Sequence, residues 1–279
     1  MSTRIITADH LCTLHAQLIS EEKSPATIQK YMRDAQTFLD FAGNREITKT
    51  LVIDYKAHLL QCGYTACSIN SMLAGLNSLL NLLGWNDCRV KNIRYQRQLF
   101  CTKETALSKE EYLRLIAAAQ DRPQLQLVIQ TLGATGIRVS ELQYFTVESV
   151  KNRCINVNCK GKLRKVLIPE SLRQLLLNYA QKESISNGCI FVTRSKNPLD
   201  RSNIWSQMKG LCEKANVDRA KIYPHNLRKL FARTFYRTDN DICKLADVLG
   251  HGCIETTRIY IMDTGTEHNQ TLESLGLVI

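Results

Sequence analysis

Side chains between residues 225 and 260 could together bind and attack a phosphate group. Arg228 lies three residues after His225, and Tyr260 lies nine residues after His251. Arginine holds phosphate oxygens with a planar fork of donors and keeps its charge near neutral pH. Histidine can donate a hydrogen bond to phosphate or move a proton in the same pH range. Because a tyrosine hydroxyl can act as a covalent nucleophile, the set fits a site that grips a phosphate and attacks it.

Local signals around these residues predict how they are positioned. Pro224 favours the start of a helix, which would place His225 and Arg228 one turn apart on the same face. Gly250 fits the left-handed position that ends a helix. We therefore expect His251 to be presented on a rigid turn.

Two upstream segments carry further charged residues that could serve the same site. The run TGIRVSEL holds Arg138 at an expected helix start and Glu141 three residues later. Taken alone, this pair reads as a structural ion pair. Residues 154–168 read as two short strands around a glycine turn, and the lysines Lys160 and Lys162 stand at that turn. Basic turns of this kind are mostly solvated, or hold phosphates non-specifically.

The combination resembles the signature of the tyrosine recombinases, the phage-integrase family. That signature is His-x-x-Arg, then Leu-Gly-His, then a tyrosine nine residues after this histidine, as in HNLRKLFARTF and LGHGCIETTRIY. The family's upstream arginine and glutamate match TGIRVSEL, and its hairpin lysine matches CKGKLRKVLIP. The chain departs from the common pattern at Lys229, where many members have histidine, and at Gly252 and Cys253, where two serines are frequent. The resemblance implies a set of catalytic residues: Arg138, Lys160, His225, Arg228, His251 and Tyr260.

The resemblance also implies a reaction that cuts and rejoins DNA strands. Arg138 and Arg228 would hold the non-bridging phosphate oxygens and bear the charge of the transition state, with Glu141 fixing Arg138 in place. Tyr260 would attack the phosphorus and form a 3′-phosphotyrosyl link. A 5′-hydroxyl from another strand could then reverse the step. This scheme needs no metal or nucleotide cofactor, and no metal-ligand spacing or phosphate-binding glycine loop stands in the sequence.

Proton transfer would fall to the remaining residues of the set. His225 is the candidate to take the proton of the nucleophile, while His251 would hydrogen-bond the phosphate. Lys160 would protonate the departing 5′-hydroxyl, because the family's hairpin lysine precedes a glycine in the same way. Lys162 is the competing choice for this role.

Length and periodicity predict two mainly α-helical domains. The chain has 279 residues, which is more than one typical domain. Apolar residues at helical spacing indicate four helices in the first part, which resemble the family's N-terminal core-binding domain. The predicted divisions are an N-terminal helical DNA-binding domain over 1–88, a basic linker over 89–106 and a catalytic domain over 107–279. The catalytic domain is expected to be α-rich with a small β-hairpin or sheet.

Other segments carry weaker local signals. Ile19 continues the apolar stripe of the first expected helix, and residues 189–192 read as a short strand. A single helix is expected over residues 202–215. Either Asp239 or Asn240 is expected to cap the helix that leads to the second catalytic histidine.

Composition adds constraints on partners and location. The net charge of +11 and the pI of about 9.2 favour a polyanionic partner, and both predicted domains are positive, which would suit DNA held from two sides. The 11 cysteines contain no CxxC pair, which indicates thiols in a reducing cytosol. The sequence has no signal-peptide core and no apolar stretch near the ~20 residues of a membrane span. We expect a cytoplasmic protein of bacterial, phage or mobile-element origin.

The resemblance covers nearly the whole chain and looks like the minimal two-domain architecture of Xer-type enzymes. It implies a site-specific recombinase for integration, excision, inversion or resolution. The implied partners are double-stranded DNA with an inverted-repeat core site and further copies of the chain in a homotetramer. Leu272, Leu275 and Leu277 could form an apolar tail helix that docks into a neighbouring subunit. Two other functions stay open: a type IB topoisomerase-like strand transferase acting as a monomer, and a DNA-binding regulator that has lost cleavage.

Overall fold

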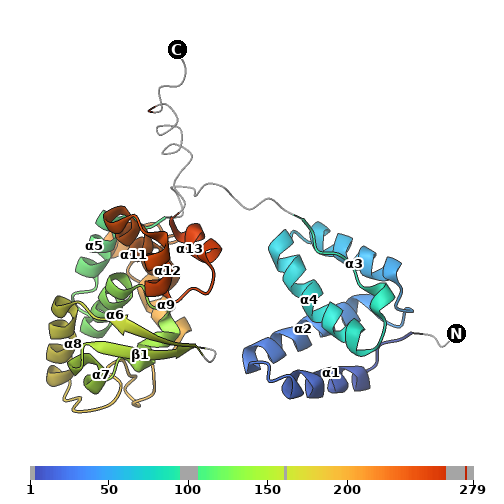
Figure 1. Cartoon of the computed structure of the whole chain (residues 1–279), viewed down its shortest axis with the longest axis horizontal. Helices are drawn as coiled ribbons and strands as arrows, with labels where there is room; N and C mark the ends of the chain where they lie inside the picture. The colour runs from blue at the N-terminus through green and yellow to red at the C-terminus, as the bar shows by residue number, and fades with distance from the viewer. Residues whose placement is uncertain (1–3, 95–105, 160–161, 262–273, 275–279) are drawn as a thin grey trace. The chain divides into compact units, whose positions relative to one another are not determined.

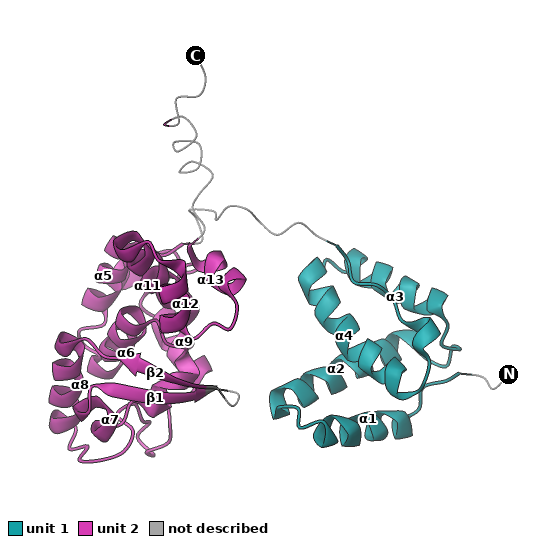
Figure 2. Cartoon of the chain, in the orientation of Figure 1, with its two compact units in different colours: residues 1–97 teal, residues 98–279 magenta. Residues whose placement is uncertain are grey.

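The chain folds into two compact units. The computed structural model describes most of the chain, namely residues 4–94, 106–159, 162–261 and 274. At positions 159 and 162 only the backbone is described. Unit 1 comprises residues 1–97 and unit 2 residues 98–279, and Figure 2 colours them separately. The roles of the predicted domains stay predictions.

Unit 1 is built from four α-helices around one apolar core (Figure 1). Ser24 accepts a hydrogen bond from the backbone N–H of Thr27 and so caps the second helix, while Pro25 occupies its first turn. Thr48 and Thr65 cap the next two helices in the same way. The prediction of four helices is confirmed. Their bounds are α1 (Ala8–Ser20), α2 (Pro25–Ala42), α3 (Lys49–Gln61) and α4 (Ala66–Leu82), followed by the short 3-10 helix η1 (Asn86–Cys88).

Two features of unit 1 differ from expectation. Ile19 is 54% exposed, because α1 packs against α2 and α4 with one narrow face that already holds Leu14 and Leu18. Residues 89–94, predicted as the start of a linker, lie against the unit. Here the side chain of Asn70 accepts a hydrogen bond from the N–H of Ile93 at 2.7 Å and donates one to its carbonyl at 2.9 Å.

Unit 2 is mainly α-helical and contains one two-stranded antiparallel sheet. Its first helix begins with the expected capping box, in which Ser108 and Glu111 each bond the other's backbone N–H. The predicted fold class, a helical N-terminal part followed by an α-rich part with a small hairpin, is confirmed. The elements are α5 (Lys109–Ala118), α6 (Pro123–Thr135), η3 (Val139–Tyr144), α7 (Val147–Lys151), β1 (Cys154–Cys159), β2 (Lys162–Leu167), α8 (Glu170–Lys182), α9 (Arg201–Lys209), α10 (Cys212–Ala215), α11 (Pro224–Asp239), α12 (Ile242–Leu249) and α13 (Ile254–Ile261).

The hairpin of β1 and β2 turns one face toward the core. Val157 pairs with Arg164, and both stand on the same face as the buried Val166. The opposite face carries Leu163 and Leu167, which are 78% and 76% exposed. On β2, Arg164 is therefore turned inward, and Leu163 and Leu167 are turned outward.

Two predicted elements of unit 2 differ in the structure. Residues 189–192 form only isolated bridges, Thr146 to Cys189 and Val192 to Pro198. The apolar side chains of this segment are buried in the core. A short apolar run of this kind is therefore explained by burial and does not require a strand. The helix expected over 202–215 is broken into α9 and α10 at Gly210, a poor residue for a helix interior.

The cap of α12 is Asp241, so the prediction of Asp239 or Asn240 was wrong. The carboxylate of Asp241 accepts hydrogen bonds from the N–H groups of Cys243 and Lys244. Asn240 instead ends α11 in the left-handed conformation, with φ of 52°. Asparagine tolerates this conformation at a helix end, so the turn between α11 and α12 is one residue later than expected.

The last three helices pack around a small apolar cluster of their own. Ala232, Leu245 and Leu249 are its buried members, and the ring of Tyr260 lies against them. This cluster joins α11, α12 and α13, which carry the C-terminal motif. Among the described residues, no helix is long and apolar enough to cross a membrane.

Candidate active site

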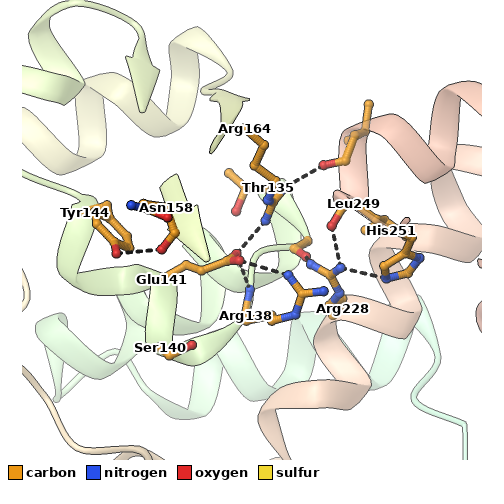
Figure 3. A network of polar contacts seen from close by, with 12 residues as sticks. Thr135, Arg138, Ser140, Glu141, Tyr144, Asn158, Arg164, Arg228, Leu249 and His251 are labelled. Carbon is orange, nitrogen blue, oxygen red and sulfur yellow. Dashed lines mark hydrogen bonds and ion pairs between the residues drawn. The ribbon is translucent and has the colours of Figure 1, made fainter. Parts of the chain in front are cut away.

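Arg228 is fixed at the centre of the predicted site. It lies on α11, and the residue is only 1% exposed. Its guanidinium donates hydrogen bonds to the carbonyl of Gly136, to the carbonyl of Leu249 at 2.6 Å and to Nε2 of His251 at 2.8 Å (Figure 3). One side chain thus ties together the ends of α6 and α12 and the second histidine of the motif.

Arg138 and Glu141 form a second fixed group beside it (Figure 3). Arg138 is the N-cap residue of η3, so it lies where a helix begins, as predicted. Glu141 is 1% exposed, and its two carboxylate oxygens accept bonds from the backbone N–H of Arg138 at 2.8 Å and from its Nη1 at 3.0 Å. The side chain of Arg138 remains 39% exposed. The buried carboxylate therefore aims an arginine that an anion can still reach.

Tyr260 lies against both histidines of the motif. The centroid of its ring is 5.1 Å from that of His225 and 5.1 Å from that of His251. The guanidinium carbon of Arg228 is 5.9 Å from the tyrosine ring centroid. Four functional groups thus converge from three parts of the chain. His225 and Arg228 come from α11, His251 comes from the turn that follows α12, and Tyr260 comes from α13.

The hydrogen bonds of His251 define its protonation. A guanidinium can only donate, so Nε2 of His251 accepts from Arg228. The proton of the neutral ring is then on Nδ1, which lies 2.9 Å from the hydroxyl of Thr257 and donates to it. Thr257 is fully buried on α13, three residues before Tyr260. The same bond therefore fixes the ring of His251 and anchors the helix that carries Tyr260.

The electrostatic surroundings favour the neutral form of both histidines. Desolvation, together with the charges of Lys229 and Arg228, lowers the pKa of His225 to about 4. Desolvation and the charges of nearby arginines, Arg228 first, likewise lower the pKa of His251 to about 4. His225 still has an exposed edge, and solvent there screens part of the effect. At neutral pH both rings are uncharged.

Two glycines shape the backbone around Arg228. Gly136 ends α6 in the left-handed conformation, with φ of 61°, and a Cβ atom there would lie 2.9 Å from ring carbons of Phe231. Gly250 ends α12 with φ of 65°, so the prediction that it occupies this conformation is confirmed. Both turns bring a carbonyl from the end of a helix within reach of Arg228.

The structure brings together Arg138, Glu141, His225, Arg228, His251 and Tyr260. Lys160 lies outside the described residues, and so does the side chain of Lys162. The choice between these two lysines therefore stays open.

Two further residues belong to this group and were not singled out from the sequence. Thr257 holds His251, as described above. Arg164 on β2 donates to Oε2 of Glu141 at 2.5 Å. A signal for Arg164 existed, because alternation along β2 puts it on the face of the buried Val166. The exposed Leu163 and Leu167 obscure that alternation, because apolar residues on a strand are expected to face the core.

A pocket of about 630 Å³ opens beside the site. It is lined by the exposed side of Arg138, by His225 and Arg228, and by Arg201 and Trp205 of α9. The described residues contain no group of three or more histidine, cysteine or acidic side chains that could hold a metal ion.

Comparison with known proteins identifies the family. The model of the phage integrase family matches residues 105–267. The chain belongs to the phage integrase family. A model of the phage integrase N-terminal SAM-like domain matches residues 13–86. The SAM-like match lies in unit 1, and the described residues of the integrase match lie in unit 2.

Relatives in this family are tyrosine recombinases. The chain is 29% identical to the tyrosine recombinase XerD of Halalkalibacterium halodurans, with 91% of this chain and 92% of the relative covered. It is 30% identical to the tyrosine recombinase XerA of Thermococcus kodakarensis, with 92% of each covered. The prediction of a tyrosine-type site-specific recombinase is confirmed.

Solved structures agree with this fold. A XerA recombinase crystal structure matches with a TM-score of 0.54 and 26% identity, covering 95% of this chain and 97% of the other. A lambda integrase tetramer bound to a Holliday junction matches with a TM-score of 0.75, covering 94% of this chain and 79% of the other. At 18% identity, the second likeness shows a shared phage integrase fold alone.

Proposed function

We propose that Tyr260 attacks a DNA phosphodiester and forms a 3′-phosphotyrosyl link that a 5′-hydroxyl of another strand later resolves. The observation that carries this proposal is the placement of the Tyr260 ring 5.1 Å from the rings of both His225 and His251 and 5.9 Å from the guanidinium carbon of Arg228. A phenol is activated as a nucleophile by a neighbouring base or by a cation. Both kinds of group lie next to it.

The arginines would bind the phosphate and stabilise the charge that develops on it. Arg138 presents an exposed guanidinium whose direction is fixed by Glu141. Arg228 has five N–H donors, and its bonds to Gly136, Leu249 and His251 leave others for a phosphate oxygen. Preorganised donors of this kind stabilise a transition state without having to reorganise during the reaction.

The histidines would manage the proton of the nucleophile and the phosphate contact. His225 is neutral at physiological pH, since its pKa is lowered to about 4, so it can take the proton of Tyr260. His251 would hydrogen-bond a phosphate oxygen beside Arg228. Protonation of the leaving 5′-hydroxyl by Lys160, or by Lys162, stays a prediction.

The partners we propose are double-stranded DNA with an inverted-repeat core site and further copies of this chain in a homotetramer. The net charge of +11 suits a polyanion. Two similar solved structures support the DNA partner and the tetramer: a lambda integrase tetramer is bound to a Holliday junction, and the XerH recombinase is bound to its difH substrate. A cytoplasmic location stays a prediction.

Assembly would use an apolar pocket of unit 2 together with the C-terminal tail. The pocket, of about 550 Å³, is lined by Tyr112, Leu230, Phe231 and Phe235 among others. Residues 262–279 lie outside the described part, and their sequence includes the apolar run LGLVI. We propose that the tail of a neighbouring subunit occupies this pocket. A chain shortened after Asp263 is expected to bind a single site normally and to lose higher assemblies in gel-shift and light-scattering measurements, and unchanged assembly would contradict the proposal.

Covalent trapping tests the proposed nucleophile. The protein is incubated with a nicked duplex that carries its binding site, sought first in the DNA flanking the gene, and adducts are resolved on a denaturing gel. We expect an adduct with the wild type and none with Tyr260→Phe. Tyr179→Phe on α8 removes a tyrosine hydroxyl elsewhere in unit 2 and is expected to keep the adduct. An adduct that persists in Tyr260→Phe would overturn the assignment.

A further inference from the structure

Arg164 makes contacts that no assigned function of the site explains. It lies on β2, and its side chain is only 12% exposed. Its Nη2 donates to Oε2 of Glu141 at 2.5 Å, and its Nη1 donates to the carbonyl of Val248 at 2.7 Å (Figure 3). Both ends of the guanidinium fork are thus bound to protein acceptors, one on η3 and one on α12. Unlike Arg138, this arginine has both of its terminal nitrogens bonded to protein acceptors, and its Nε atom is buried without a partner among the described residues.

The bond to Glu141 completes the support of Arg138. Oε1 of Glu141 accepts from the side chain of Arg138, and Oε2 accepts both from the backbone of Arg138 and from Arg164. Without Arg164, a buried carboxylate would keep a single cationic partner and could turn about its side-chain bonds. Arg164 therefore limits the directions in which Glu141 can hold Arg138.

The bond to Val248 reaches the other half of the site. The carbonyls of Val248 and Leu249 are consecutive at the C-terminal end of α12, where carbonyl groups lack partners within the helix. Arg164 binds the first and Arg228 binds the second. Positive groups are favoured at this end of a helix by its dipole. Two arginines from different elements thus fix the helix end that leads into His251.

Gly250 shows how tightly Arg164 fits there. A Cβ atom at Gly250 would lie 2.8 Å from Nε of Arg164 and closer still to its Cδ. The arginine stem therefore passes directly over the backbone of the turn. The glycine is needed for this approach as well as for its left-handed conformation, with φ of 65°.

We propose that Arg164 is a positioning residue of the recombination reaction. Through Glu141 on one side and Val248 on the other, it sets the distance between Arg138 and the pair formed by Arg228 and His251. These are the groups that the proposed function has bind one phosphate, so the inference rests on that function. Arg164 itself does not touch the phosphate.

The test separates positioning from phosphate binding. Single-turnover cleavage of the nicked duplex and DNA affinity are measured for the wild type and for Arg164→Ala. A misplacement near 1 Å can slow a reaction by about 10²-fold, so we expect a loss of that order in cleavage rate at saturating DNA. The dissociation constant is expected to change less than about threefold, with the same salt dependence, because no phosphate contact is lost. Arg164→Lys can keep one of the two bonds and is expected to recover part of the rate.

A double-mutant cycle with Arg138 tests the route of the effect. If Arg164 acts through Arg138, Arg164→Ala is expected to slow an Arg138→Ala protein by less than about threefold, measured over long incubations. A general loss of folding would instead slow both backgrounds equally and would lower the melting temperature in parallel. Arg173→Ala is the matched control, since the guanidinium of Arg173 also donates two hydrogen bonds, here both to the carboxylate of Glu170, at 2.9 and 2.6 Å. It is expected to cleave at the wild-type rate.

The outcomes distinguish this inference from the proposed function. No adduct with the wild type on DNA that it binds would overturn the proposed function. An adduct with the wild type and an equal rate with Arg164→Ala would overturn only the role of Arg164. A large loss of DNA affinity in Arg164→Ala would also overturn it, since that result would make Arg164 a phosphate ligand.

Discussion

Arg228 donates a hydrogen bond to Nε2 of His251, with 2.8 Å between the two nitrogens. This bond uses the lone pair of the imidazole, so in this arrangement Nε2 cannot donate to a phosphate. As long as Nδ1 remains the donor in its bond to the hydroxyl of Thr257, His251 has to gain a proton before it can donate from Nε2. Binding of DNA and uptake of a proton are therefore expected to be linked.

The first prediction concerns the pH dependence of DNA binding. The pKa of His251 is lowered to about 4 in the protein alone, and a bound phosphate is expected to raise it. Between these two values, DNA binding takes up a proton, so affinity rises as pH falls, by at most about tenfold per pH unit for one proton. Fluorescence anisotropy from pH 8 to pH 6 measures this slope. His251→Gln is expected to flatten it, and an unchanged slope would mean that other groups take up the proton.

The second prediction concerns stability of the protein without DNA. The pKa values of His225 and His251 are about 4 when folded, below the unperturbed ~6.5 of histidine. In that window the unfolded chain binds more protons than the folded one, so stability falls as pH falls from about 6.5 toward 4. Thermal melting across this range is expected to show a shallower fall for His251→Gln than for the wild type. Equal slopes would show that the folded protein tolerates the charged ring.

The third prediction concerns the bond between Thr257 and His251. Thr257→Val keeps the shape of the side chain but leaves Nδ1 of His251 without an acceptor, which costs about 1–3 kcal/mol for a buried group. The cleavage rate is expected to fall more than DNA affinity, because the ring loses its orientation. Thr257→Ser keeps the hydroxyl and serves as the matched variant, with a rate near that of the wild type. Equal losses in both variants would point to packing of the methyl group.

The fourth prediction uses two glycines that share a backbone conformation. Gly188 and Gly250 have φ of 75° and 65°, but only Gly250 has a neighbour within 4 Å of an added Cβ. Gly188→Ala is expected to cost about 1–2 kcal/mol from left-handed strain. Gly250→Ala is expected to lose about 1–3 kcal/mol beyond that because it displaces Arg164. Chemical denaturation of both variants measures the difference, and equal losses would mean that Arg164 moves aside freely.

Much of the helical framework could be predicted because its signals are local. Ser24 and Ser108 cap their helices as expected, since each acts on backbone groups within the next turn. The candidate catalytic set follows from spacing and resemblance, and the structure brings Arg138 next to Arg228. The exact residues of the turns could not be predicted as well. Asn240 ends α11, so the cap of α12 is the next residue, Asp241.

The residues that were missed depend on contacts between distant segments. Arg164 and Glu141 are far apart in sequence, and their bond exists only because β2 folds back beside η3. Near Arg164, Leu163 and Leu167 obscure the pattern by facing outward. The sequence does not single out Thr257, because its bond to His251 depends on how the turn at Gly250 places that histidine. Tertiary partners of this kind cannot be read from local periodicity.

The close passage of Arg164 over Gly250 has a consequence for how this sequence can vary. A side chain at position 250 and a long side chain at position 164 cannot occupy the same space. Substitutions at these two positions are therefore interdependent, although the residues belong to motifs on different elements. An engineer who alters the hairpin is also, through Arg164, altering the turn that presents His251.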